Sequence, residues 1–137
     1  MRVAAIDIGT VTSRLLVADV DASGVRQVAR QSAITNLGEG VDASGVLLPE
    51  AIDRTVAQVA EYRKAIDACS ADCAVDRVVA LATSASRDAQ NSDVFVSRLR
   101  EVGVELAVIP GEREAALSFL GASNDFRNED LLFADIG

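Results

Sequence analysis

The chain has 137 residues, of which 50% are hydrophobic and 4% aromatic, and this composition fits one globular domain with a mostly aliphatic core. A net charge of -8 argues against nucleic acid or an anionic membrane surface as the main partner. The chain contains no histidine, so histidine-based nucleophiles, general bases and zinc sites are excluded, and any chemistry must use carboxylates, arginines, hydroxyls and the backbone.

The first 35 residues predict three strands in an antiparallel meander. Residues 1–8 form an apolar, β-branched run that indicates a buried strand, and Gly9 ends it. Residues 14–20 and 25–35 are the second and third strands. Asp21-Ala22-Ser23-Gly24 between them has the composition of a tight turn.

A long helix is expected after the loop at 36–48, which carries four residues that favour turns. Pro49 suits the first helical position because its missing N–H is not needed there, and the helix is expected to end near Cys69. Its apolar face is formed by Ile52, Val56, Val59 and Ile66.

The remaining residues alternate between strands and helices. Strands are predicted at 77–82, where the run is apolar enough to be fully buried, and at 104–109. A helix at 92–102 has Ser92 as its expected N-cap, and a second helix at 112–120 is expected to close at Gly121. A linker at 122–130 and a last strand at 131–136 complete the chain.

A hairpin followed by helix-strand alternation implies an α/β fold with a mixed sheet and helices on its faces. Ala5-Ile6-Asp7-Ile8-Gly9 is echoed by Phe133-Ala134-Asp135-Ile136-Gly137, which suggests a duplicated architecture. The expected organisation is therefore a lobe at 1–121, a linker at 122–130 and the first strand of a second lobe at 131–137.

The two cysteines and the N-terminus both favour a cytoplasmic protein. Cys69 and Cys73 have no further Cys or His to complete a metal site, so reduced thiols near a helix end are expected. The first apolar run is interrupted by Asp7 and is too short for a signal peptide or a membrane span.

The segment Asp7-Ile8-Gly9-Thr10-Val11-Thr12-Ser13 is a candidate phosphate loop. Gly9 permits a tight turn, and the following amides and hydroxyls form a concave set of donors for phosphate oxygens. Asp7 fits beside such a site if a divalent cation bridges it to the phosphate, as Mg²⁺ does. An ordinary turn with a hydrogen-bonded Asp7 is the alternative.

Arg87 and Glu114 are the candidate catalytic residues. Arg87 follows a buried strand at the edge where ligands of α/β sheets bind, and its planar fork suits a phosphoryl group, although pairing with Asp88 would explain it equally well. Gly111-Glu112-Arg113-Glu114 begins a helix. Glu112 is expected to serve only the helix dipole, whereas Glu114 is the candidate that positions or deprotonates a water.

Six segments together resemble the exopolyphosphatase and guanosine pentaphosphate phosphatase (Ppx/GppA) family of the actin, sugar kinase and heat-shock chaperone superfamily. They are AIDIGTVTSRLL at 5–16, LGEGV at 37–41, GVLLPEAIDR at 45–54, ATSASRDAQN at 82–91, IPGEREA at 109–115 and ADIG at 134–137.

The resemblance implies a ribonuclease H-like, actin-like lobe with a mixed five-stranded sheet. It implies that Asp7 to Thr12, including Gly9 and Thr10, is the first phosphate loop, and that Asp135 to Gly137 begins the second. Glu114 matches the family's water-activating glutamate, and Arg87 would bind the terminal phosphoryl group. Mg²⁺ is the implied cofactor, near Asp7 and Asp135.

The implied activity is release of terminal phosphate from inorganic polyphosphate or guanosine pentaphosphate. Val11 stands where the family usually has asparagine, Pro110 where it has serine, and Ala116 where it has arginine. These departures keep open a module that senses guanosine tetraphosphate without turnover. ATP-dependent sugar or acid kinase activity is a third possibility. The apolar strand at 131–136 also allows a homodimer, because an unpaired strand seeks an exposed edge.

Overall fold

The computed structural model describes residues 1–71, 73–124, 126 and 132. Its elements in chain order are β1 (Arg2–Ile8), β2 (Thr12–Asp21), β3 (Gly24–Ile34), α1 (Val41–Ser44), α2 (Pro49–Cys69), β4 (Arg77–Ala82), α3 (Ser84–Asp88), α4 (Ser92–Glu101), β5 (Leu106–Val108) and α5 (Gly111–Ser123). The predicted strand at 131–136 lies outside the described residues, apart from Leu132.

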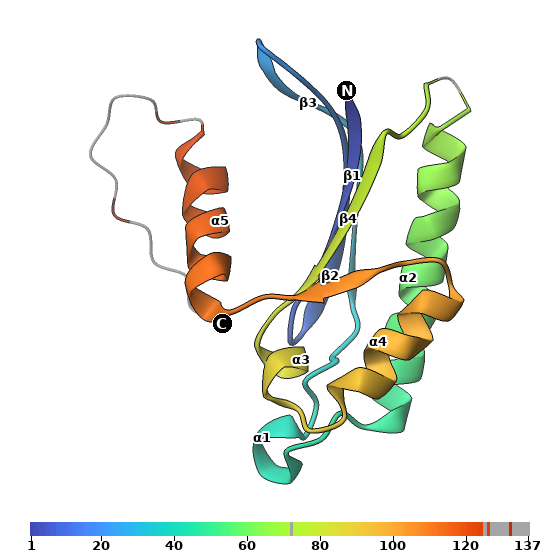
Figure 1. Cartoon of the computed structure of the whole chain (residues 1–137), viewed down its shortest axis with the longest axis vertical. Helices are drawn as coiled ribbons and strands as arrows, with labels where there is room; N and C mark the ends of the chain where they lie inside the picture. The colour runs from blue at the N-terminus through green and yellow to red at the C-terminus, as the bar shows by residue number, and fades with distance from the viewer. Residues whose placement is uncertain (72, 125, 127–131, 133–137) are drawn as a thin grey trace.

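The strands form one five-stranded mixed sheet in the order β3-β2-β1-β4-β5. β1, β2 and β3 pair antiparallel as the predicted meander, whereas β4 lies parallel to both β1 and β5. Helices α2 and α4 lie on one side of the sheet and α5 lies on the other (Figure 1). The predicted α/β fold with a mixed sheet is confirmed.

The turn between β2 and β3 follows the predicted chemistry. Asp21 Oδ1 accepts hydrogen bonds from the Ser23 amide at 2.7 Å and from the Ser23 hydroxyl at 2.5 Å. These bonds stabilise the carboxylate and lower the pKa of Asp21. Gly24 has a φ of 133°, which residues with a Cβ rarely adopt. The local sequence therefore fixes this hairpin.

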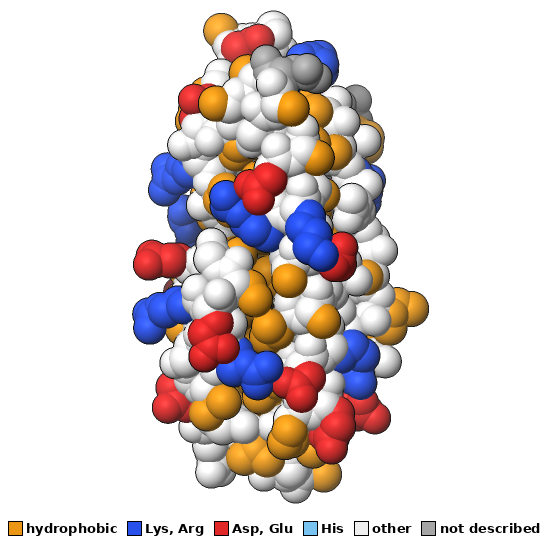
Figure 2. Space-filling model, turned by 90° about the vertical axis from the view of Figure 1, so that its right-hand side faces the viewer, with side chains coloured by type: hydrophobic (Ala, Val, Ile, Leu, Met, Phe, Trp, Pro, Cys, Tyr) orange, Lys and Arg blue, Asp and Glu red, His pale blue; other side chains and the backbone are white. Residues whose placement is uncertain are grey.

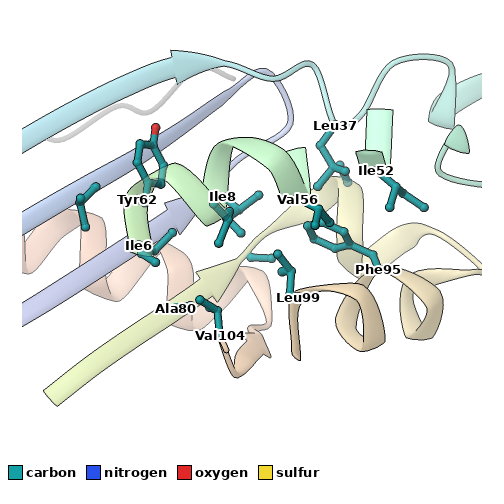
Figure 3. Close-up of a cluster of buried hydrophobic side chains, with 14 of the residues drawn as sticks. Ile6, Ile8, Leu37, Ile52, Val56, Tyr62, Ala80, Phe95, Leu99 and Val104 are labelled. Atoms are coloured by element: carbon teal, nitrogen blue, oxygen red, sulfur yellow. The ribbon is translucent and has the colours of Figure 1, made fainter. Parts of the chain in front are cut away.

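The core lies between the sheet and helices α2 and α4 (Figure 3). Pro49 stands in the first turn of α2, and the four apolar residues predicted for its inner face are all buried. Tyr62 of the same face is also fully buried, and its hydroxyl donates a hydrogen bond to the Ser13 carbonyl at 2.9 Å. α4 adds Phe95 and Leu99, so this side of the sheet is closed by side chains of two helices.

The strands at 2–8 and 77–82 are buried on one face only, and the prediction of fully buried strands is wrong. In β1, Ala4, Ile6 and Ile8 are buried, whereas Ala5 is exposed. Only two residues of β4 are buried. The reason is that α5, the helix on the second side, buries none of its described residues.

The outer surface of α2 and α4 carries interspersed charges of both signs (Figure 2). Arg98 of α4 pairs with Asp53 of α2 at 2.9 Å, and Arg63 pairs with Asp67 along α2 at 2.9 Å. Within the described part of the chain, no helix is both long and apolar enough to cross a membrane. The polar outer surface agrees with an amphipathic helix that packs on a sheet.

Three local expectations are corrected by the structure. The loop at 36–48 contains the one-turn helix α1, which is bounded by Gly40 and Gly45 in left-handed conformations. The N-cap of α4 is Asn91 rather than Ser92. α5 continues through Gly121 to Ser123 because an interior glycine costs a helix only about 1 kcal/mol. Two residues of the expected linker are therefore helical.

Both cysteines are free thiols at the end of α2, as expected. Cys69 is the last residue of the helix and is partly buried, whereas Cys73 is exposed. The Arg2 guanidinium donates hydrogen bonds to the carbonyl of Cys69 at 3.0 Å and to that of Cys73 at 3.3 Å. Arg2 therefore ties the start of β1 to the end of α2.

Candidate phosphoryl-transfer site

The loop at 9–11 joins β1 to β2 and holds its carbonyl groups toward the protein. The Thr10 carbonyl accepts a hydrogen bond from the Gly38 amide at 2.9 Å, and the Val11 carbonyl accepts from the amides of Thr35 and Asn36, both at 2.9 Å. The Gly9 amide donates to the carbonyl of Thr12 at 3.0 Å. Residues 35–38 therefore fix the loop by donating hydrogen bonds to its carbonyl groups.

The amides of Thr10 and Val11 remain available as donors. No hydrogen bond from either amide is found among the residues that the structure describes. The Val11 side chain is 53% exposed at the tip of the loop and offers no polar atom. Backbone donors in such a turn are suited to phosphate oxygens, so the predicted loop has the expected chemistry without a side-chain donor at position 11.

A hydrogen bond joins this loop to α3. The hydroxyls of Thr10 and Ser84 lie 2.9 Å apart, and either one can donate. The Thr83 amide donates to the Ile8 carbonyl at 3.3 Å. Because β1 and β4 are parallel, the loop after one and the helix after the other meet at the same edge of the sheet. This edge is where α/β folds bind ligands.

Arg87 and Glu114, the two candidate catalytic residues, lie close together at that edge. Arg87 lies in the last turn of α3, and its Nη1 is 3.5 Å from Glu114 Oε2 and donates to the Ile109 carbonyl at 3.2 Å. The Arg87 Nε donates a hydrogen bond to Asp88 Oδ1 at 3.3 Å. The side chains of Arg87 and Glu114 are 33% and 34% exposed, so a ligand can reach both.

Glu114 is held in the first turn of α5. The helix begins at Gly111, and the amides of Arg113 and Glu114 donate to the Pro110 carbonyl at 3.0 and 3.1 Å. Glu112 is exposed, which agrees with its expected role at the helix dipole. Pro110 sets the entry to the helix with an extended backbone, so the carboxylate of Glu114 faces Arg87 rather than open solvent.

Asp7 stands at the end of β1 and pairs with Arg14, its cross-strand neighbour, at 3.2 Å. Both side chains are about half exposed. Among the described residues, Asp7 forms no ion pair with Arg87 and no hydrogen bond with Glu114, and no cluster of three acidic, cysteine or histidine side chains that could hold a metal ion is found. Thr12 begins β2 beside the loop. Asp135 and Gly137 lie outside the described residues.

Three residues that support the loop were missed by the sequence reasoning. Arg54 of α2 holds the segment after β3, because its Nε donates to the Thr35 carbonyl at 2.6 Å and its Nη2 pairs with Glu39 at 3.0 Å. Ser84 and Gly38 contact Thr10 directly. A small open pocket beside this contact is lined by Thr10, Gly38, Val41, Asp42, Ser84, Ala85 and Asp88. Each of the three lies in a segment that carries the family resemblance: Gly38 at 37–41, Arg54 at 45–54 and Ser84 at 82–91.

Comparison with known proteins matches residues 16–137 to the Ppx/GppA phosphatase family. Exopolyphosphatase 2 of Mycobacterium tuberculosis is 44% identical over 131 residues, which cover 88% of this chain and 40% of that protein. Guanosine-5'-triphosphate,3'-diphosphate pyrophosphatase of Photobacterium profundum is 29% identical over 136 residues, covering 98% of this chain and 27% of that protein.

The fold agrees with the sequence match. The crystal structure of the Aquifex aeolicus member of the Ppx/GppA protein family superposes with a TM-score of 0.83 and 36% identity, covering 94% of this chain and 41% of that one. The chain thus spans about two-fifths of the length of exopolyphosphatase 2 and of the Aquifex aeolicus protein, and 27% of the Photobacterium profundum protein. Its sheet and helices correspond to the N-terminal portion of that structure.

Proposed function

This chain belongs to the Ppx/GppA phosphatase family, and from that premise we propose that the protein carrying it hydrolyses terminal phosphoanhydrides of inorganic polyphosphate or guanosine pentaphosphate. The names of its relatives support this substrate class. The observation that carries the proposal is the approach of Arg87 to Glu114, 3.5 Å apart at the sheet edge. One cation for a phosphoryl group and one carboxylate for a water are thereby placed side by side.

The roles follow from the charges of these residues. The water oxygen attacks the terminal phosphorus, the Glu114 carboxylate takes the proton of that water, and the anhydride P–O bond breaks. The products are inorganic phosphate and a chain shortened by one phosphate. Arg87 binds the equatorial oxygens of the transferred group through two N–H donors.

The amides of Thr10 and Val11 bind the phosphate chain next to the reacting group. This loop supplies donors whose positions are fixed in advance by the bonds to residues 35–38. Positioning and charge stabilisation provide most of the rate enhancement in phosphoryl transfer. An active site without histidine is therefore sufficient for this reaction.

Asp7 and the hydroxyls of Thr10 and Thr12 fit a Mg²⁺ ion in their donor chemistry. Mg²⁺ prefers oxygen ligands and commonly uses one or two carboxylates together with substrate phosphates and waters. Asp7 is half exposed at the sheet edge, and we propose that Asp135 supplies the second carboxylate. When bound, the ion neutralises charge on the phosphate oxygens.

The proposed organisation is a two-lobed protein in which residues 1–121 form the first lobe, 122–130 the linker and 131–137 the first strand of the second. Its support is the repeated Asp-Ile-Gly at 7–9 and 135–137. In that arrangement Gly137 and Asp135 begin a second phosphate loop. The substrate would then bind between two similar loops.

Glu114→Gln in the full-length protein tests the proposal. Phosphate release from polyphosphate in the presence of Mg²⁺ should fall by about 10²–10⁴-fold, because the amide cannot accept a proton from water. Glu112→Gln is the matched control, since it changes the same helix turn at an exposed position and should retain turnover. Unchanged turnover in Glu114→Gln contradicts the role given to this residue.

The same measurement separates the alternatives. Saturable binding of guanosine tetraphosphate by the wild-type protein without phosphate release would select a sensing module. The apolar Val11 side chain at the loop tip favours that alternative. Transfer of phosphate from ATP to a sugar or an acid would select a kinase.

A further inference from the structure

Gly38 is packed between the phosphate loop and α3, and we propose that it is a positioning residue for the loop. A Cβ at position 38 would overlap the Cγ2 methyl of Thr10 and would lie 3.2 Å from the Ala85 Cβ and 3.3 Å from the Thr10 Cβ. The last two distances are shorter than ordinary carbon contacts. The absence of a side chain at position 38 therefore sets how closely the loop approaches α3.

The φ angle of Gly38 is not in the positive range, unlike that of Gly40 at 74°. Backbone conformation therefore does not demand glycine at position 38. Glycine is required at position 38 for a steric reason instead, because a Cβ there would come too close to Thr10 and Ala85. This makes the effect of a side chain at position 38 specific to the loop and α3.

Thr10 can avoid an added methyl group in two ways, and both disturb the site. Rotation about its Cα–Cβ bond moves the Cγ2 methyl but also moves Oγ1 from the Ser84 hydroxyl, which lies 2.9 Å away. A shift of the backbone breaks the 2.9 Å bond from the Gly38 amide to the Thr10 carbonyl. The rotation removes the bond that joins the loop to α3. The backbone shift moves the donor amides of the loop relative to Arg87 on α3.

The segment at 35–39 is held in place and cannot easily move away from an added methyl group at position 38. The Arg54 guanidinium holds the carbonyls of Thr35 and Asn36 at 2.6 and 3.3 Å, and it pairs with Glu39 at 3.0 Å. Leu37, between these anchors, is fully buried in the core. An added methyl group at position 38 should therefore displace the exposed Thr10 rather than the segment at 35–39.

This inference rests on the proposed function for its effect on turnover. Gly38→Ala in the full-length protein should lower kcat/KM for phosphate release from polyphosphate by about 100-fold, the effect expected when reacting groups are misplaced by about 1 Å. Thr10→Ser removes the overlapping methyl but keeps the hydroxyl. In the Thr10→Ser background, Gly38→Ala should lower kcat/KM by only about fivefold, because the two changes are coupled.

The experiment compares wild type, Gly38→Ala, Thr10→Ser and the double variant. Gly121→Ala adds the same methyl where no described atom lies within 4 Å, and it controls for the loss of a glycine. Crystal structures of the four proteins supply a readout that does not depend on turnover. The Thr10 and Ser84 hydroxyls should separate beyond hydrogen-bonding distance in Gly38→Ala and should meet again in the double variant.

The two readouts distinguish failure of this inference from failure of the proposed function. An intact Thr10–Ser84 bond in Gly38→Ala, or an equal loss of kcat/KM in both backgrounds, overturns the positioning role. If wild type shows no phosphate release, the proposed function fails, whereas restoration of the bond in the double variant still supports the role of Gly38.

Discussion

Helices α2 and α5 lie on opposite sides of the same sheet and differ in what they bury. α2 places seven of its 21 residues in the core, whereas none of the described residues of α5 is buried. α5 carries Phe119 and Leu120 on its surface at 47% and 67% exposure. Packing therefore concentrates on the α2 side, and the first turn of α5 is held at the sheet edge by few contacts.

The difference separates the residues that stabilise the fold from those proposed for chemistry. Phe95, Tyr62 and Ile6 are buried in the core between the sheet and α2 or α4. Arg87 and Glu114 are one-third exposed where α3 and α5 begin or end. Substitutions on the two sides should accordingly affect different measurements.

The largest effect on stability is expected from Phe95→Ala. Phe95 is fully buried, and its truncation leaves a cavity that should lower the free energy of unfolding by about 3–5 kcal/mol. Urea unfolding of the full-length protein measures this loss. Val94→Ala, at a neighbouring exposed position, should change it by no more than about 0.5 kcal/mol. An equal loss of unfolding free energy in Phe95→Ala and Val94→Ala would contradict the view that stability comes from the packed side of the sheet.

Arg87→Lys is expected to act on the site and to leave stability nearly unchanged. Lysine keeps the charge but loses the planar fork that contacts Ile109, Asp88 and Glu114. We expect kcat/KM for polyphosphate to fall by about 10–100-fold, the loss of one charged hydrogen bond. Arg113→Lys, one residue before Glu114 and exposed, is the control that should retain activity.

The smallest effect is expected at Asp19, on the edge of the packed side. Arg2 donates to both of its carboxylate oxygens, at 2.7 and 3.1 Å, and this bond lowers the pKa of Asp19 below its ordinary value of 3.8. Arg26 is a second, exposed partner. A lowered folded pKa means that the ion pair stabilises the protein above pH 3.8 and that this contribution is lost as pH falls through the folded pKa.

Asp19→Asn removes that contribution. The urea midpoint of the variant should lie below that of wild type at pH 7, and the difference should shrink as the pH is lowered below 3.8. Asp76→Asn is a useful comparison, because among the described residues Asp76 Oδ2 accepts a hydrogen bond only from the Arg2 amide, at 2.7 Å. A difference between wild type and Asp19→Asn that stays constant with pH would contradict the linkage.

Much of the site could be predicted because the residues follow strand ends. Asp7 lies at the end of β1, and Arg87 and Glu114 lie in the helices that follow β4 and β5. The sequence could not show that Asp7 pairs with Arg14, because that contact depends on the register of β1 and β2. Gly38 and Ser84 escaped prediction for a similar reason, since their contact with Thr10 joins segments 28 and 74 residues away.

The sequence by itself determined the turn at 21–24, the start of α2 at Pro49 and the apolar face of that helix. Each of these depends on neighbouring residues, through turn chemistry, proline geometry and helical periodicity. The absence of histidine also limited the chemistry to carboxylates, arginines and backbone donors.

Only the tertiary structure decided which face of the sheet is packed and which residues meet at its edge. β1 and β4 are mostly apolar runs, yet one face of each is less covered because α5 buries none of its described residues. The contact of Arg87 with Glu114 arises from parallel pairing of β4 with β5, and the contact of Thr10 with Gly38 arises from the path of residues 35–39. Long-range pairing sets these distances, and no local pattern encodes it.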